Sequence, residues 1–410
     1  MFDSNKYRLS NGVELISIKK ETQIFSIHVG VKVGSLFETK SEKGISHFVE
    51  HMLFKGTLNR TNEKLNNDLE ALGGEYNAYT DHNCTVYSIT ALKEEFNNSM
   101  EILSDMIKQS IFPEVEVEKE RGVILAEIRT SKDDIEDYSF RRINEVAFKN
   151  SPLKYDILGT EKHVKKFNRE DLLNFYNTYY NANNCCITIV SPYEHTYVCE
   201  VIENYFGNWR EGKIPSKDNI VEKNIEGTFI SHKKDIEQST ILYLYTFHGL
   251  DKKEELALRV LNHKLGDSTN SILFRKLREE KGLVYDVYTS LDTTNYVKTL
   301  YIYTSVEEDK LKESMEVIES CIEDINKGNI VFDDSTIELM KKALKTGVVF
   351  TLEDPTDLSN YVLHQMIDGD NIYAFIEDME QLENIKKENI YDINEKVLNH
   401  PTIHILQKEG

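Results

Sequence analysis

The sequence has 410 residues, of which 40% are hydrophobic and 29% are charged. This composition is ordinary for a folded protein in water, and the chain is long enough for two domains or more. Its 49 basic and 70 acidic residues give a net charge of −21, which argues against a nucleic acid as partner. No stretch approaches the ~18 consecutive apolar residues of a membrane-spanning helix, so no membrane partner is expected.

The N-terminus and the cysteines indicate a compartment. Residues 1–6 have no apolar core like that of a signal peptide. The five cysteines are an odd number and include no C-x-x-C pair, which is typical of reduced structural thiols in a cytosolic protein. We therefore expect a cytoplasmic protein.

The first predicted elements are a hairpin, a strand and a helix. Apolar residues alternate around Asn11-Gly12 between residues 6 and 20, which predicts a hairpin entering a sheet. Residues 26–31 continue as a strand. Residues 45–54 have the periodicity of a helix with one apolar face that can pack on a core.

The other face of this helix carries two histidines and a glutamate. His47 and His51 lie one turn apart, so their imidazoles can converge on one point, and Glu50 lies beside them. Two neutral imidazoles and a carboxylate in this register suit a Zn²⁺ ion with the carboxylate acting on its bound water. The pattern is H-x-x-E-H, the inverted form of the zincin motif. The alternative is a solvated helix face that happens to carry two histidines.

The rest of the first half alternates helices with strands and ends in a polar run. This run, residues 212–225, contains Pro215 and is the predicted linker between a domain at 1–211 and a second at 226–410. The predicted helices cover residues 62–72, 96–109, 117–128, 138–148 and 169–179, and the predicted strands cover residues 76–80, 84–90 and 186–191.

A third metal ligand has to come from another element, because a catalytic zinc usually keeps three protein ligands. Glu120 and Glu127 lie seven residues apart on the predicted helix 117–128, so they point the same way, toward its buried side. A carboxylate there is costly unless it is paired or bound to a metal. The alternative is an ordinary pair of glutamates bonded to an Arg or a Lys.

Taken together, these residues resemble the pitrilysin or insulinase family of zinc peptidases, and most closely its mitochondrial-processing-peptidase-like branch. The match consists of His47, Glu50 and His51, with Glu127 following 76 positions after His51. The resemblance implies that His47, His51 and Glu127 ligate one zinc ion per chain. It also implies that Glu50 is the general base and that Glu120 orients a histidine ligand.

The second half repeats the first without the metal residues. At an offset of 209, His47, Glu50 and His51 fall on Leu256, Arg259 and Val260, so the second domain is predicted to keep the fold and to have lost the site. The alternative is chance identity in two short patches. The repeat is carried by Gly73, Tyr76, Tyr79 and Thr80, which match Gly282, Tyr285, Tyr288 and Thr289, and by residues 99–102, which match residues 314–317 at an offset of 215.

The second half has a candidate site of its own. Arg278 falls in the last turn of a predicted helix that Gly282 ends, and Tyr285 falls in the strand that follows. The resemblance implies that this pair holds substrate near the zinc, with the Tyr285 hydroxyl bonding the carbonyl oxygen as it becomes an oxyanion. The alternative is a surface arginine and a core tyrosine.

The predicted fold is α+β, with two similar domains that face each other like a clamshell, each an antiparallel sheet backed by helices. The predicted function is a zinc metalloendopeptidase that cleaves unfolded peptides or leader segments inside a chamber enclosed by a homodimer. By resemblance, the peptide adds as a strand to the sheet edge at Asn77, Ala78, Tyr79 and Thr80. The alternatives are an active subunit of a heterodimer and a peptide-binding subunit without activity; the complete zinc set argues against the latter.

Overall fold

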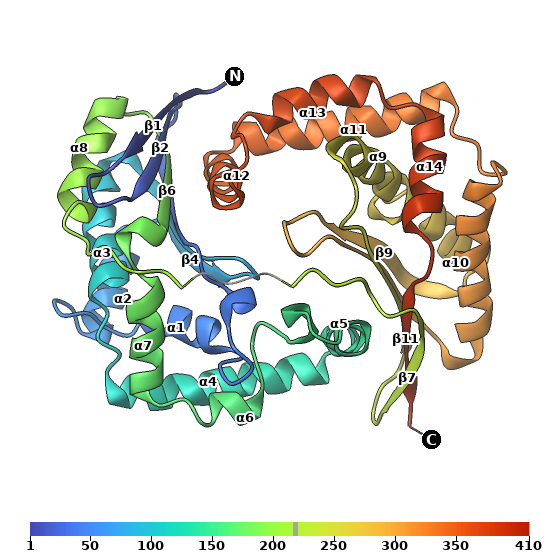
Figure 1. Ribbon diagram of the computed structural model, residues 1–410, viewed down its shortest axis with the longest axis horizontal. Helices are drawn as coiled ribbons and strands as arrows, with labels where there is room; N and C mark the ends of the chain where they lie inside the picture. The colour runs from blue at the N-terminus through green and yellow to red at the C-terminus, as the bar shows by residue number, and fades with distance from the viewer. Residues whose placement is uncertain (216–219, 410) are drawn as a thin grey trace. The chain divides into compact units, whose positions relative to one another are not determined.

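The computed structural model describes residues 1–215 and 220–409 and divides into two compact units (Figure 1). Unit 1 comprises Met1–Arg129, Asp156–Asp218 and Val349–Tyr373, and unit 2 comprises Thr130–Tyr155, Asn219–Val348 and Ala374–Gly410. Residues 216–219 of the predicted linker lie outside the described residues. No helix in the described ranges is both long and apolar enough to cross a bilayer.

Unit 1 is built on a six-stranded sheet in the order β1-β2-β6-β3-β5-β4. The predicted hairpin is confirmed, and Gly12 adopts a φ of +94° between its two strands, a conformation that glycine favours. The strands are β1 (Asp3–Arg8), β2 (Glu14–Lys19), β3 (Ile24–Val31), β4 (Glu75–Thr80), β5 (Thr85–Leu92) and β6 (Cys185–Ser191).

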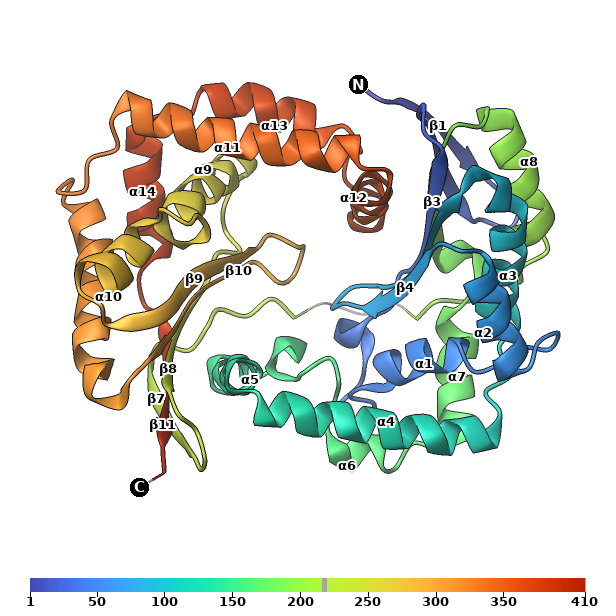
Figure 2. The same ribbon diagram turned by 180° about the vertical axis from the view of Figure 1, so that it is seen from behind.

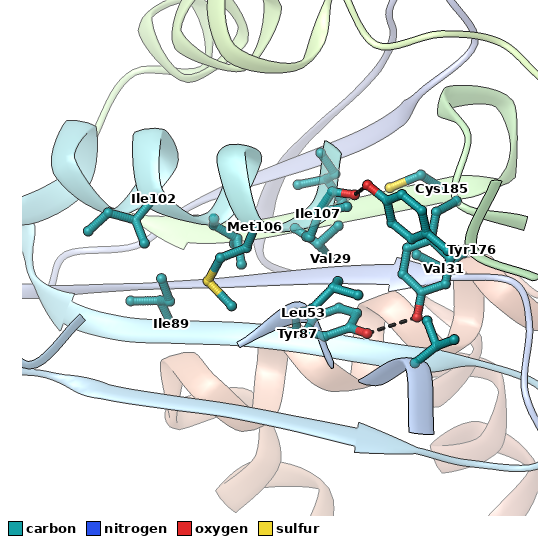
Figure 3. Packing of buried hydrophobic residues seen from close by; sticks show 14 of the residues in the cluster. Val29, Val31, Leu53, Tyr87, Ile89, Ile102, Met106, Ile107, Tyr176 and Cys185 are labelled. Atoms are coloured by element: carbon teal, nitrogen blue, oxygen red, sulfur yellow. Dashed lines mark hydrogen bonds between the residues drawn. The ribbon is translucent and has the colours of Figure 1, made fainter. Parts of the chain in front are cut away.

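Helices cover both faces of this sheet. On one face, Ile102 and Met106 of α3 pack against Val29 and Ile89 (Figure 3). On the other face lies α12, whose buried side chains complete a second core layer (Figure 2). The helices that belong wholly to unit 1 are α1 (Ile45–Leu53), α2 (Asn62–Ala71), α3 (Phe96–Gln109), α6 (Glu161–Val164), α7 (Arg169–Tyr179), α8 (His195–Phe206) and α12 (Pro355–Asp368).

Unit 2 is built on a five-stranded sheet in the order β7-β11-β8-β10-β9. Helix α5 covers one face, where the ring of Phe140 lies 5.1 Å from that of Tyr301. The strands are β7 (Gly227–Lys233), β8 (Ser239–Thr246), β9 (Val284–Asp292), β10 (Thr299–Val306) and β11 (Thr402–Lys408). The helices are α5 (Ile135–Ala147), α9 (Lys252–Asn262), α10 (Leu311–Asn326), α13 (Ala374–Glu383) and α14 (Lys387–Val397).

The two sheets repeat one topology, as the sequence predicts. Without β1, the order β2-β6-β3-β5-β4 corresponds to β7-β11-β8-β10-β9. The halves also exchange one helix each, because α5 from the first half belongs to unit 2 and α12 from the second half belongs to unit 1. The long helices α4 (Glu114–Asp133) and α11 (Asp334–Glu353), each of which begins in one unit and ends in the other, lead into the exchanged helices. The prediction of two contiguous domains did not include this exchange.

The prediction of an α+β fold with two helix-backed sheets is confirmed, but neither sheet is wholly antiparallel. β2 pairs parallel with β6, and β7 pairs parallel with β11. In unit 1 the late strand β6 inserts between β2 and β3, which run in opposite directions. A strand between two antiparallel neighbours has to be parallel to one of them, so the insertion makes the sheet mixed.

Candidate metal centre

Helix α1 divides as its periodicity predicts. Its apolar face enters the core of unit 1, whereas His47 and His51 are only partly buried on another face. The core residues of α1 are Ile45, Phe48, Val49, Met52 and Leu53.

Three candidate ligand atoms converge beside this helix. His47 Nε2 and His51 Nε2 lie 3.2 Å apart, and Glu127 Oε2 of α4 lies 3.8 Å from the first and 3.7 Å from the second. Ligands at zinc distances of about 2.0–2.2 Å in a tetrahedron lie roughly 3.3–3.6 Å from one another. Glu127 Oε2 is also buried without a hydrogen-bond partner among the described residues. A bound cation would satisfy it, so the three residues fit a zinc ion.

Glu120 is the partner of one of these histidines. Its carboxylate lies 3.0 Å from His51 Nδ1 and 2.8 Å from Lys55 Nζ. Burial raises the pKa of Glu120, but the hydrogen bonds from His51 and Lys55 outweigh this and hold the pKa below its usual range. The ionised carboxylate accepts the His51 Nδ1 proton, which leaves a lone pair on Nε2 for a metal. Glu120 therefore makes both contacts: Oε2 bonds His51, and Oε1 bonds Lys55, as the alternative of an ordinary lysine-paired glutamate predicts.

The pKa values of the two histidines differ because their neighbours differ. Burial and the charge of His51 lower the pKa of His47 to about 3, so this imidazole is neutral and able to ligate at neutral pH. Burial also lowers the pKa of His51, but the hydrogen bond to Glu120 and the surrounding carboxylates, Glu127 and Glu50, raise it overall. The site therefore attracts a cation to His51, whether a proton or a metal.

Glu50 lies on α1 with 8% of its surface exposed. Burial raises the pKa of its carboxyl, although a hydrogen bond from Thr80 and the charge of His51 lower it in part. The Thr80 hydroxyl donates to Glu50 Oε2 at 2.6 Å. This contact between α1 and β4 was not foreseen, because nothing local relates two residues thirty positions apart.

The N-terminus of α1 is held by a residue that the sequence analysis missed. The N-cap, Gly44, offers no side chain. Instead, the buried carboxylate of Glu38 accepts from the backbone N–H of Gly44 at 3.0 Å and of Ser46 at 2.9 Å. Burial raises the pKa of Glu38 to about 7 despite the nearby ammonium of Lys43, at 3.9 Å. The six-residue spacing from Glu38 to Gly44 matches no local capping pattern, so no sequence signal could have found it.

The predicted substrate strand is β4, the last strand in its sheet. Successive side chains of β4 point to opposite faces. Thr80 contacts Glu50 on the side of α1, whereas the Tyr79 hydroxyl bonds Asn360 and His364 of α12 at 2.7 and 2.8 Å. The Ala78 N–H donates to the Asn77 side chain at 2.9 Å.

The structure brings Arg278 and Tyr285 together within unit 2. The Arg278 guanidinium lies 5.5 Å from the Tyr285 ring centroid and 5.0 Å from that of Phe274. Tyr285 is 71% exposed, so the alternative of a core tyrosine is wrong. As predicted, Gly282 follows the helical segment with a φ of +60°, and its N–H donates to the Arg278 carbonyl.

In the second repeat, α9 corresponds to α1 and carries no metal site. Leu256 and Val260 are buried, and the Arg259 guanidinium donates to Thr293. Within residues 1–215 and 220–409, the one cluster of three suited to a metal is His47, His51 and Glu127. The second repeat therefore keeps the helix, with apolar side chains at the positions of the two histidines.

Comparison with known proteins agrees with this division. Residues 14–161 match the model of the family "Insulinase (Peptidase family M16)", and residues 166–344 match "Peptidase M16 inactive domain". The chain is 30% identical to an uncharacterized zinc protease of Rickettsia felis over 97% of this chain and 96% of that protein. The chain belongs to the insulinase family, peptidase family M16.

Other relatives of this M16 protein carry related names. The chain is 30% identical to the uncharacterized zinc protease YmxG of Bacillus subtilis, with 85% of this chain and 84% of that protein covered. It is 27% identical to the mitochondrial-processing peptidase subunit beta of Caenorhabditis elegans, with 88% and 79% covered. These names and the family model support a peptidase that uses zinc.

Solved structures confirm the two-unit fold of this M16 protein. A protease from Helicobacter pylori superposes with a TM-score of 0.93 at 20% identity, covering 99% of this chain and 100% of that one. An M16-like peptidase from Alicyclobacillus acidocaldarius superposes with a TM-score of 0.84 at 20% identity, covering 100% and 99%.

Proposed function

We propose that this M16 protein is a zinc metalloendopeptidase that hydrolyses unfolded peptides or leader segments. The observation that carries the proposal is the convergence of His47, His51 and Glu127, with Glu50 on the same helix as both histidines. Zinc at these residues would act as a Lewis acid and lower the pKa of a bound water. The chain's own side chains would supply the remaining chemistry.

Glu50 is the proposed general base. Its carboxylate accepts a proton from the attacking water and donates it to the leaving amine. A group that first accepts and then donates a proton works best when its pKa lies close to the working pH, and burial shifts the pKa of Glu50 in that direction. Glu120 holds the His51 ring in the orientation that ligation requires.

The peptide is proposed to bind as an added strand along the edge of β4, at Asn77, Ala78, Tyr79 and Thr80. An edge strand presents backbone groups to an incoming chain, which gives affinity with little demand on sequence. For unit 2 we propose the roles implied by the family resemblance: Arg278 holds the peptide, and the Tyr285 hydroxyl bonds the developing oxyanion. A cytoplasmic homodimer that encloses a chamber completes this proposal.

A second candidate is an active subunit that works with a different chain. The names of two relatives favour it, since the similar proteins of Caenorhabditis elegans and Bos taurus are each called a mitochondrial-processing peptidase subunit beta. The mass of the purified protein in solution, alone and mixed with candidate partner chains, distinguishes the two assemblies. Cleavage by the protein alone favours the homodimer, whereas cleavage only in the mixture favours the heterodimer.

The function is tested by the substitution Glu50→Gln. Glutamine is nearly isosteric but cannot accept the proton, so turnover of a peptide library, read by mass spectrometry, should fall about 10²-fold or more while zinc content stays constant. Glu118→Gln is the matched control, because Glu118 is an exposed glutamate paired with Arg121. If Glu50→Gln cleaves peptides at the wild-type rate, Glu50 is not the base and the proposed mechanism is wrong.

A further inference from the structure

Among the described residues, the Glu50 carboxylate has a single hydrogen-bond partner. Within the part of the chain that the structure describes, the bond from Thr80 Oγ1 to Glu50 Oε2, at 2.6 Å, is the one hydrogen bond that this carboxylate makes. A glutamate side chain rotates about three bonds, so a carboxylate held at one oxygen has far fewer orientations than a free one. The bond restrains Oε2 and thereby narrows the range of directions in which Oε1 can point.

Thr80 is itself held firmly. It ends β4 and pairs across the strands with Thr85, and a β-branched side chain in a strand has restricted rotation about χ1. The preceding residue, Tyr79, is tied to α12 by its hydroxyl on the opposite face of the sheet. The Thr80 hydroxyl is therefore a fixed donor relative to β4.

We propose that Thr80 is a positioning residue for the general base, a role that rests on the proposed function of Glu50. Its backbone belongs to the strand on which the peptide is proposed to add, whereas its side chain holds the base. Thr80 would thus fix the position of the base carboxylate relative to the backbone of the bound substrate. This role differs from the direct substrate contact that the family resemblance implies for Thr80.

The first test compares three variants on one fluorogenic peptide chosen from those that the wild type cleaves. Thr80→Val keeps the shape and the strand preference but removes the hydroxyl; we expect kcat to fall about 10- to 100-fold, with KM and zinc content nearly unchanged. Thr80→Ser restores the hydroxyl and should recover most of the loss. Thr85→Val removes the hydroxyl of the cross-strand neighbour, which donates to the Val33 carbonyl, and should keep wild-type kcat.

The second test places Thr80→Val in the Glu50→Gln background. If Thr80 acts through Glu50, the double variant should be no slower than Glu50→Gln alone. An additional loss equal to that in the wild-type background would overturn the proposal. A rise in KM at unchanged kcat would also overturn it, because that result indicates that the Thr80 hydroxyl contacts the substrate. Equal impairment of Thr80→Val and Thr80→Ser would overturn it as well, because that result indicates a role in packing.

The two tests separate this inference from the proposed function. If Glu50→Gln is inactive and Thr80→Val is fully active, only the role of Thr80 is wrong. If Glu50→Gln is itself fully active, the base assignment is wrong and the role of Thr80 is overturned with it.

Discussion

Helices α1 and α9 are corresponding elements of the two repeated units, and they use the same helix face differently. In α1 this face carries His47 and His51, whereas in α9 the matching positions are the buried Leu256 and Val260. Apolar side chains can close the core at these positions in unit 2. The fold therefore does not need the two histidines, and unit 1 retains partly buried polar groups that packing alone does not require.

The N-termini of the two helices differ in the same way. Helix α9 begins with a capping box in which Asp251 and Glu254 each accept from the other's backbone N–H, at 2.8 and 3.0 Å. Helix α1 has Gly44 as its N-cap and depends on Glu38, which follows the short 3-10 helix Ser35–Phe37. Helix α9 is capped by its own sequence, whereas helix α1, which carries the candidate ligands, is held by a tertiary contact.

The largest expected difference between the two helices is in zinc content. Purified without added metal, the wild type should hold one tightly bound zinc per chain, and His47→Ala should lose it because one of three ligands is gone. Arg259→Ala, in the helix that corresponds to α1, is the control and should retain full zinc. Full zinc in His47→Ala, measured by elemental analysis, would contradict the assigned ligands.

A second expected difference is that unit 2 contributes to kinetics without contributing to metal binding. Tyr285→Phe should lower kcat about 10²–10³-fold and raise KM by a smaller factor, because its hydroxyl is proposed to bond an oxyanion formed in the transition state. Arg278→Ala should mainly weaken substrate binding, since a guanidinium can hold a peptide carbonyl in both ground and transition states. Steady-state kinetics with zinc measured in parallel checks both. If both variants keep the wild-type kcat and KM, neither Arg278 nor Tyr285 takes part in binding or catalysis, and the proposed role of unit 2 is wrong.

The two helix N-termini should differ in stability when their caps are removed. Glu38→Ala removes the acceptor of two backbone N–H groups and the carboxylate 3.9 Å from the buried Lys43 ammonium, so the free energy of unfolding should fall by about 3–5 kcal/mol. Asp251→Ala removes an exposed local cap and should cost about 1 kcal/mol. Urea unfolding measures both. Equal losses in the two variants would show that the tertiary cap on α1 stabilises the protein no more than the local cap on α9.

The last expected effect develops only as the pH falls below 6.5, and it concerns one buried histidine beneath each exchanged helix. Burial lowers the pKa of His28 in β3 and of His404 in β11 to about 4 each, assisted by His364 and Arg142 respectively. Between pH 6.5 and 4, each of these histidines is protonated in the unfolded chain but stays neutral in the folded chain. Each histidine should therefore destabilise the fold by about 1.4 kcal/mol per pH unit as the pH falls toward 4.

The measurement is the pH dependence of unfolding in His28→Gln and His404→Gln, each compared with the wild type at the same pH so that contributions from the metal ligands cancel. Either variant should flatten the slope between pH 6.5 and 4. An unchanged slope in both would mean that neither imidazole stays neutral in the folded protein.

The sequence by itself determined the local elements and most of the metal centre. Helix periodicity predicted α3 and α7 at the observed bounds, and the H-x-x-E-H spacing placed His47, Glu50 and His51 on α1. Such predictions succeed because the 3.6-residue and two-residue periods fix which side chains share a face. Glu127 required the family resemblance in addition, since it lies on a separate helix.

Only the tertiary structure decided the insertion of β6, the exchange of α5 with α12, and the contacts of Glu38 and Thr80 with α1. Strand order and helix exchange join segments far apart in sequence, and a single chain carries no periodic signal for such pairings. Glu38 and Thr80 look like ordinary loop and strand residues in the sequence. Their roles arise because folding brings a carboxylate to a helix terminus and a hydroxyl to the proposed base, where burial makes each hydrogen bond costly to lose.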